Sequence, residues 1–139
     1  MNISPRLYSK LVHTEVLLKI TYGLVFIAAG ADKFFNYLVQ WEQYLSPYVM
    51  QFIPLTASQI MMAVGVIEIV IGLWILLRCS CVAAYAAMLW LFLIVANLLS
   101  MHAYYDIAVR DAVMAVGALA LARLSAIKDE AEHVPAHNV

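Results

Sequence analysis

A glutamate near the middle of an apolar stretch is the residue of this sequence best suited to chemistry. Glu68 lies about ten residues into the stretch 58–77, which on a helix is roughly 15 Å deep, close to the middle of a bilayer. An ionised group at that depth costs about 2.5–3.5 kcal/mol, so it needs a partner, a polar cavity or a function. Gly65 and Gly72 share its helical face and let another helix approach closely. We therefore expect Glu68 to point into a helix bundle and away from lipid.

Further polar side chains gather toward one end of the apolar stretches, which we call the outer end. They are Asp32, Lys33, Asn97, His102, Asp106, Arg110 and Asp111. Asp111 leads a face of alanines that is suited to helix packing, so we expect it to point inward as Glu68 does. Acids and bases would then lie together in the outer half of the bundle.

These polar residues have three interpretations. They form internal salt bridges that fix the register of the helices, or some of them are loop residues in water. Alternatively, they line a pocket that opens to the outer face and binds a small ligand or relays protons. Trp90, near the middle of the stretch 79–99, would either pack in the bundle or stack on a ligand. The candidate pocket residues are Glu68, Arg110, Lys33, Asn97, Asp111, His102 and Trp90.

The composition places all of these residues in a membrane protein. The chain has 139 residues, of which 65% are hydrophobic and 12% are charged, and its mean hydropathy is +0.88. Soluble domains are about 45–50% apolar and about 25% charged, so the excess apolar surface must face lipid. A net charge of −1 provides no basic patch for nucleic acid.

The sequence predicts a single all-α domain over residues 1–139, an integral membrane four-helix bundle. About 20 apolar residues cross a bilayer, and four stretches are long enough: 16–35, 58–77, 79–99 and 107–124. The stretch 125–139 is expected to be a tail in the cytoplasm. Arg78 separates the second and third stretches, which predicts a tight helical hairpin there.

Lysine and arginine in the flanks predict the orientation of the bundle. Six lie on the side of the two chain ends (Arg6, Lys10, Lys19, Arg78, Arg123 and Lys128), and two lie on the other side (Lys33 and Arg110). Positive residues favour the cytoplasmic side. We therefore expect both termini in the cytoplasm and a multi-pass protein of the inner (cytoplasmic) membrane.

The long outer connection, residues 36–57, carries regularly spaced aromatic residues. Tyr37, Trp41, Tyr44 and Tyr48 form one stripe on a helix, interrupted near Pro47. Tyrosine and tryptophan rings favour the membrane–water interface, so one interpretation is an amphipathic segment that lies at the outer interface. The other is a cap folded over the mouth of the bundle.

Signals for common cofactors are absent from the sequence. Its histidines are scattered, and His133 and His137 alone do not predict a metal site. No glycine-rich phosphate loop occurs, so no metal, flavin or nucleotide site is expected. Cys79 and Cys81 are too few for a disulfide framework.

Three fragments resemble the DoxX-like family of small four-helix membrane proteins. They are KITYGLVFIAAGADKFF (19–35), GVIEIVIGLWILL (65–77) and VRDAVMAVGALALARL (109–124). The matching positions are Gly23, Gly30 and Lys33 in the first helix, Glu68 and Gly72 in the second, and Arg110 with Asp111 in the last. The long aromatic connection 36–57 departs from the family pattern.

The resemblance implies a membrane subunit associated with a quinone-linked oxidoreductase, with a quinone as cofactor. Glu68 would give or take a proton, and Lys33 or Arg110 would polarise a quinone carbonyl. Electrons would come from a partner protein, so the chain is at most the quinone-interacting subunit of an enzyme. Besides membrane lipid, a partner protein or further copies of the chain are expected. The alternatives are a structural membrane anchor or assembly factor, and a small transporter that acts as an oligomer.

Overall fold

The chain is all-α, as predicted, in the part described by the computed structural model, residues 4–78 and 81–133, where no strand occurs. The long helices are α1 (Pro5–Asp32), α3 (Ala57–Leu77), α4 (Cys81–Ser100) and α5 (Tyr105–His133). Between α1 and α3 lie a short 3-10 helix, η1 (Trp41–Tyr44), and the short helix α2 (Pro47–Phe52). Three of the helices, α1, α3 and α4, are long and apolar enough to cross a membrane, which makes this a membrane protein. Helix α5 is not among them, because charged residues lie at both ends of its apolar stretch.

Helices α3 and α4 begin and end close to the predicted bounds, whereas α1 and α5 are longer than predicted. Helix α1 begins at Pro5, whose fixed φ suits a first turn, and the Ser4 side chain accepts from the N–H of Leu7 as its cap. Helix α5 runs on through residues 125–133, which were predicted to be a tail. Cys79 and His137 lie outside the described residues.

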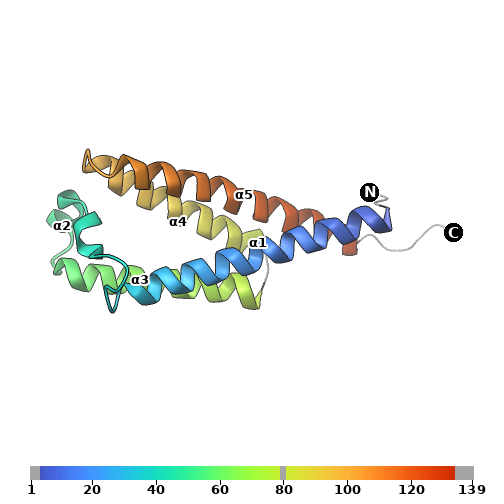
Figure 1. Cartoon of the computed structure of the whole chain (residues 1–139), viewed down its shortest axis with the longest axis horizontal. Helices are drawn as coiled ribbons and strands as arrows, with labels where there is room; N and C mark the ends of the chain where they lie inside the picture. The colour runs from blue at the N-terminus through green and yellow to red at the C-terminus, as the bar shows by residue number, and fades with distance from the viewer. Residues whose placement is uncertain (1–3, 79–80, 134–139) are drawn as a thin grey trace.

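The long helices form two pairs, α1 with α3 and α4 with α5 (Figure 1). The pairs lie close together at the end where α1 begins, where the Tyr8 hydroxyl donates to Glu132 on α5 over 2.9 Å. They separate toward the opposite end, where α2 lies (Figure 1). This second end is the one that we called the outer end.

Glycines bring α1 and α3 into backbone contact. A Cβ added to Gly65 would lie 2.6 Å from the carbonyl oxygen of Gly30, and one added to Gly72 would lie 2.7 Å from that of Gly23. The expectation that the face of Glu68 admits a neighbouring helix is therefore confirmed, and the neighbour is α1. Small residues also line the buried side of the other pair: Ala83, Ala84 and Ala87 on α4, and Ala115, Ala118 and Ala122 on α5.

Residues 36–53, which we call the cap segment, do not form the single aromatic stripe that the spacing predicted. The backbone is irregular at 36–40 and then forms η1 and α2, so the four aromatic residues do not share one helix face. Tyr37 and Tyr48 are exposed, whereas Leu45 and Ser46 are buried. Leu45 packs with Ile60 of α3. These contacts favour the cap interpretation over a segment that lies only on the interface.

Candidate ligand cavity

A cavity of about 850 Å³ lies between the two helix pairs, against the cap segment. Its wall is mostly apolar, with side chains from α1, α3, α4, α5 and the cap segment. Its polar and aromatic lining residues are Lys33, Trp41, Tyr44, Glu68, Trp90, Asn97, Arg110 and Asp111. Ligand pockets in proteins are commonly about 300–1,000 Å³ and combine an apolar wall with a few placed polar groups. The cavity has the size and lining of such a pocket.

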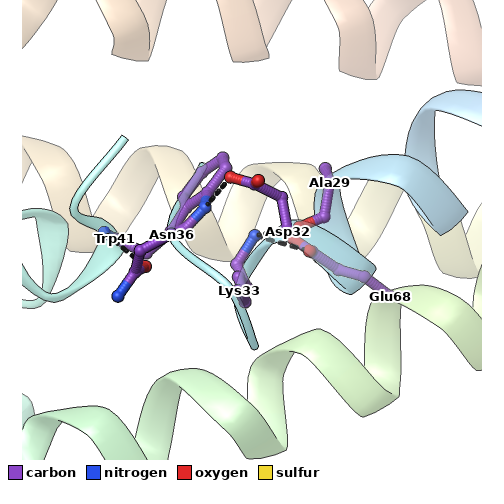
Figure 2. A network of polar contacts seen from close by, with 6 residues as sticks. All are labelled: Ala29, Asp32, Lys33, Asn36, Trp41 and Glu68. Carbon is purple, nitrogen blue, oxygen red and sulfur yellow. Dashed lines mark hydrogen bonds and ion pairs between the residues drawn. The ribbon is translucent and has the colours of Figure 1, made fainter. Parts of the chain in front are cut away.

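An ion pair between Lys33 and Glu68 lies in the wall of this cavity (Figure 2). The Lys33 Nζ is 2.6 Å from Oε2 of Glu68, and the two side chains are only 5% and 6% exposed. The same ammonium lies 3.7 Å from the centre of the Trp41 ring and 3.5 Å from the carbonyl oxygen of Ala29. Lys33 stands at the end of α1, and its side chain reaches back toward Glu68. The prediction that Glu68 points into the bundle is confirmed, and Lys33 is its partner.

Asp32 belongs to the support of the cap segment and not to the lining of the cavity. It accepts a hydrogen bond of 2.7 Å from Nε1 of Trp41 (Figure 2). It also accepts from the backbone N–H groups of Tyr37 and Leu38, at 3.1 and 3.2 Å. The carboxylate thus holds the first turn of the cap segment and sets the Trp41 ring over the Lys33 ammonium.

Asn97 was predicted to be a ligand-binding residue, and the structure shows that it also has a structural role. Its Oδ1 accepts from the N–H of Ser46 over 3.0 Å, and its Nδ2 donates to the carbonyl oxygen of Tyr44 over 2.6 Å. The hydroxyl of Ser100, one turn further along α4, donates to the Ser46 hydroxyl over 2.8 Å. Asn97 lines the cavity, but its amide joins the cap segment to α4. We call these contacts of Asn97 and Ser100 the α4 latch.

On α5, Arg110 and Asp111 form a second ion pair at the cavity. The Arg110 Nε is 3.0 Å from Oδ1 of Asp111. The Asp111 side chain is 9% exposed and that of Arg110 is 62% exposed, so the arginine lies at the margin and the aspartate inside. The prediction that Asp111 points inward with Ala115 and Ala118 is confirmed. Each acid of the cavity wall thus has its own basic partner, Lys33 for Glu68 and Arg110 for Asp111.

The structure does not bring every predicted residue to the cavity. His102 is exposed in the turn between α4 and α5, with φ at 53°, and it does not line the cavity. Asp106 is also exposed. His102 therefore lies outside this cavity, and its predicted role as a binding residue stays a prediction.

Trp90 lies where the sequence placed it, and its indole N–H is a distinctive group of the cavity wall. Its Nε1 atom is buried and has no hydrogen-bond partner within the described part of the chain. The Glu68 carboxylate lies close to it. Trp41 and Tyr44 also line the cavity, which agrees with the cap interpretation of residues 36–57. The sequence feature that pointed to these two residues was the regular aromatic spacing, which fits a cap over the bundle as well as a segment at the membrane interface.

At the opposite end of the bundle lies a further buried acid, which the sequence-based prediction missed. Glu15 on α1 is 1% exposed and lies 3.6 Å from Nζ of Lys128 on α5. It also accepts from the Ser125 hydroxyl over 3.4 Å. Glu15 precedes the predicted first span, and the extension of α5 that covers it was not predicted.

The described residues do not form a metal site. Among the residues 4–78 and 81–133, no three His, Cys, Asp or Glu side chains lie close enough to hold a metal ion.

The chain was also compared with known proteins and structures. No protein-family model, no curated protein and no solved structure matches the chain.

Proposed function

We propose that this protein binds a small amphiphilic molecule taken from the lipid phase, and that it serves as the membrane subunit of a quinone-linked oxidoreductase system. The observation that carries the proposal is a buried ion pair, Lys33 with Glu68, in the wall of an apolar cavity of ligand size. An ion pair alone in a packed bundle needs no cavity beside it. Here it lies where an apolar body and a polar head group of a ligand would meet.

In the proposed topology the protein crosses the inner (cytoplasmic) membrane four times, and both termini lie in the cytoplasm. Helix α5 is the fourth span, because it packs along α4 and buries its alanine face there. Its beginning and end then lie at the two membrane surfaces, where charged residues are tolerated. The six lysines and arginines on the side of the chain ends favour the cytoplasm for that side.

The donor set of the cavity fits a quinone head group. The Lys33 ammonium and the Trp90 N–H are donors near the Glu68 carboxylate, and a quinone carbonyl is an acceptor. A bound quinone would supply two-electron redox chemistry, with electrons delivered by a partner protein. Glu68 would hold or release the proton that accompanies them, and Lys33 would stabilise charge on a carbonyl oxygen. Arg110 would act at the margin, where its side chain is exposed.

Tryptophan fluorescence tests the binding directly. Trp41 and Trp90 line the cavity and Trp74 does not, so the Trp74→Phe variant reports on the cavity alone. Decylubiquinone added to this variant in lipid nanodiscs should quench the emission with saturation. Decylubiquinone added to Trp41→Phe/Trp90→Phe, which keeps only Trp74, is the control for collisional quenching in lipid. Equal, unsaturating quenching in both would contradict the proposal.

A second experiment tests the link to an oxidoreductase. Native mass spectrometry of the particle extracted gently from its own membrane should show a retained quinone or an oxidoreductase partner at fixed stoichiometry. The Glu68→Gln variant should fold but lose quinone-dependent activity in those membranes. Full activity of Glu68→Gln would refute the role of Glu68.

A structural anchor is the second candidate function, and one observation favours it. The acids of the cavity wall have basic partners, Lys33 for Glu68 and Arg110 for Asp111, as expected of charges that only hold helices in register. On this alternative, substitutions of Glu68 and Arg110 lower the amount of folded protein in the membrane. They leave the activity per folded molecule unchanged.

A further inference from the structure

The buried indole N–H of Trp90 is a donor that the protein itself leaves without a hydrogen-bond acceptor. Within the described residues no protein atom accepts from it, although Glu68 is near enough to attract it. A buried donor without an acceptor costs free energy, and most such groups in native proteins have partners. This donor lies in the wall of a cavity, where an acceptor atom of a ligand can reach it.

The charges of the cavity wall are already compensated. Its ionisable lining residues Lys33 and Glu68 form one pair, and Arg110 and Asp111 form another. The remaining strongly polar lining group, the amide of Asn97, is engaged in the α4 latch. An ionised ligand would bring a charge into an apolar cavity where each opposite charge already has a partner, and such a charge is costly. A neutral ligand avoids this cost.

We infer that the cavity selects neutral amphiphiles that carry a hydrogen-bond acceptor, and that Trp90 is the specificity-determining residue that donates to this acceptor. The inference rests on the proposed binding function but does not require the ligand to be a quinone. It excludes fatty-acid anions and alkylammonium ions as the preferred ligands. It also separates Trp90 from Asn97, which lines the same cavity and holds the cap segment instead.

Three probes with one ring and one tail separate the features of the ligand. Methyl 4-decylbenzoate is neutral and has a carbonyl acceptor, decylbenzene lacks the acceptor, and 4-decylbenzoate at pH 8 is an anion. Calorimetric titration into protein in nanodiscs, with empty nanodiscs as the blank, gives their affinities. The ester should bind the unmodified protein most tightly, about fivefold more tightly than decylbenzene for one net hydrogen bond. The anion should bind at least about tenfold more weakly than the ester.

The Trp90→Phe variant keeps an aromatic ring and removes the N–H. It should lose the advantage of the ester, so that the ester and decylbenzene bind within about twofold of each other, while decylbenzene itself binds nearly as before. Trp74→Phe, a change outside the cavity, is the matched control and should keep the fivefold ratio.

The possible outcomes separate this inference from the proposed function. If none of the three probes binds the unmodified protein, the binding function itself fails. If the ester and decylbenzene bind and their ratio is the same in Trp90→Phe, the N–H does not serve the ligand, and the assignment of Trp90 is wrong. Preferred binding of the anion would overturn the neutral class.

Discussion

Breaking the Lys33–Glu68 pair from either side should destabilise the protein, and breaking it from both sides should restore much of the loss. The pair is 2.6 Å long, and its side chains are 5% and 6% exposed. Lys33→Met leaves a carboxyl group in the apolar interior, and Glu68→Gln leaves an ammonium there. The double variant leaves neither charge.

The magnitude follows from the environment of the pair. Removing one partner of a buried pair in a soluble protein costs about 3–5 kcal/mol. An isolated charge near the middle of a bilayer costs about 2.5–3.5 kcal/mol on the insertion scale, and polar contacts between membrane helices average about 0.6 kcal/mol. The costs in a membrane are lower than those in a soluble protein because polar groups of the unfolded chain also find partners in lipid. We expect each single variant to lose about 2–3 kcal/mol and the double variant to lose about 1 kcal/mol relative to the unmodified chain.

Reversible unfolding in mixed micelles of lipid and dodecyl sulfate, followed by circular dichroism, gives the four free energies of the cycle. Their combination isolates the coupling between the two residues, which the expected losses put at about 3–5 kcal/mol. Arg110→Met is the control, since its guanidinium is 62% exposed and its pair should contribute less than about 1 kcal/mol. Additive losses in the double variant would refute the reasoning, because they would mean that the two charges do not stabilise each other.

Other predictions test the contacts that shape the cavity, and the same unfolding assay measures the first two. Gly65→Ala should cost about 1–3 kcal/mol, because the added Cβ would meet the backbone carbonyl of Gly30 at 2.6 Å, and a loss below about 0.5 kcal/mol would contradict this packing. Gly117→Ala should cost less than Gly65→Ala, because the added Cβ would meet the hydroxyl end of the Tyr22 side chain and no backbone atom. Combining it with Tyr22→Phe should remove this overlap. If Gly117→Ala costs as much in the Tyr22→Phe background as alone, this explanation is contradicted. Asn97→Leu should leave two backbone groups of the cap segment unpaired at about 1–3 kcal/mol each. Hydrogen exchange should then become faster at residues 41–53 and stay unchanged at the start of α1, and unchanged exchange at 41–53 would refute the α4 latch.

The sequence was informative where the direction of a side chain depends on the residues of its own helix. Glu68 with Gly65 and Gly72, and Asp111 with Ala115, each share a helical face with small residues. Small residues bury a face against another helix, so the inward direction of both acids followed from spacing alone. The same principle predicted the close approach at Gly65, although not that α1 is the neighbour.

The sequence was less informative where contacts join distant segments. The partners of Asn97 are backbone groups of the cap segment, and every residue carries such groups, so no side-chain pattern marks them. Glu15 lies among polar residues and becomes buried only because α5 extends beyond its apolar stretch to bring Lys128 alongside. A hydropathy pattern ends a helix where its apolar stretch ends, and it therefore misses such extensions.

The way the helices pair explains why the cavity lies at the outer end. Glycine contacts hold α1 against α3, and alanine faces hold α4 against α5, so each pair packs closely along its length. At the end where α1 begins, Glu15 and Lys128 also join the two pairs. At the outer end the pairs separate, and the cap segment spans the gap, fixed to α1 by Asp32 and to α4 by Asn97. Because the cavity lies between two closely packed pairs and beneath a segment fixed by a few hydrogen bonds, we expect the cap segment to move more readily than the pairs when a ligand enters.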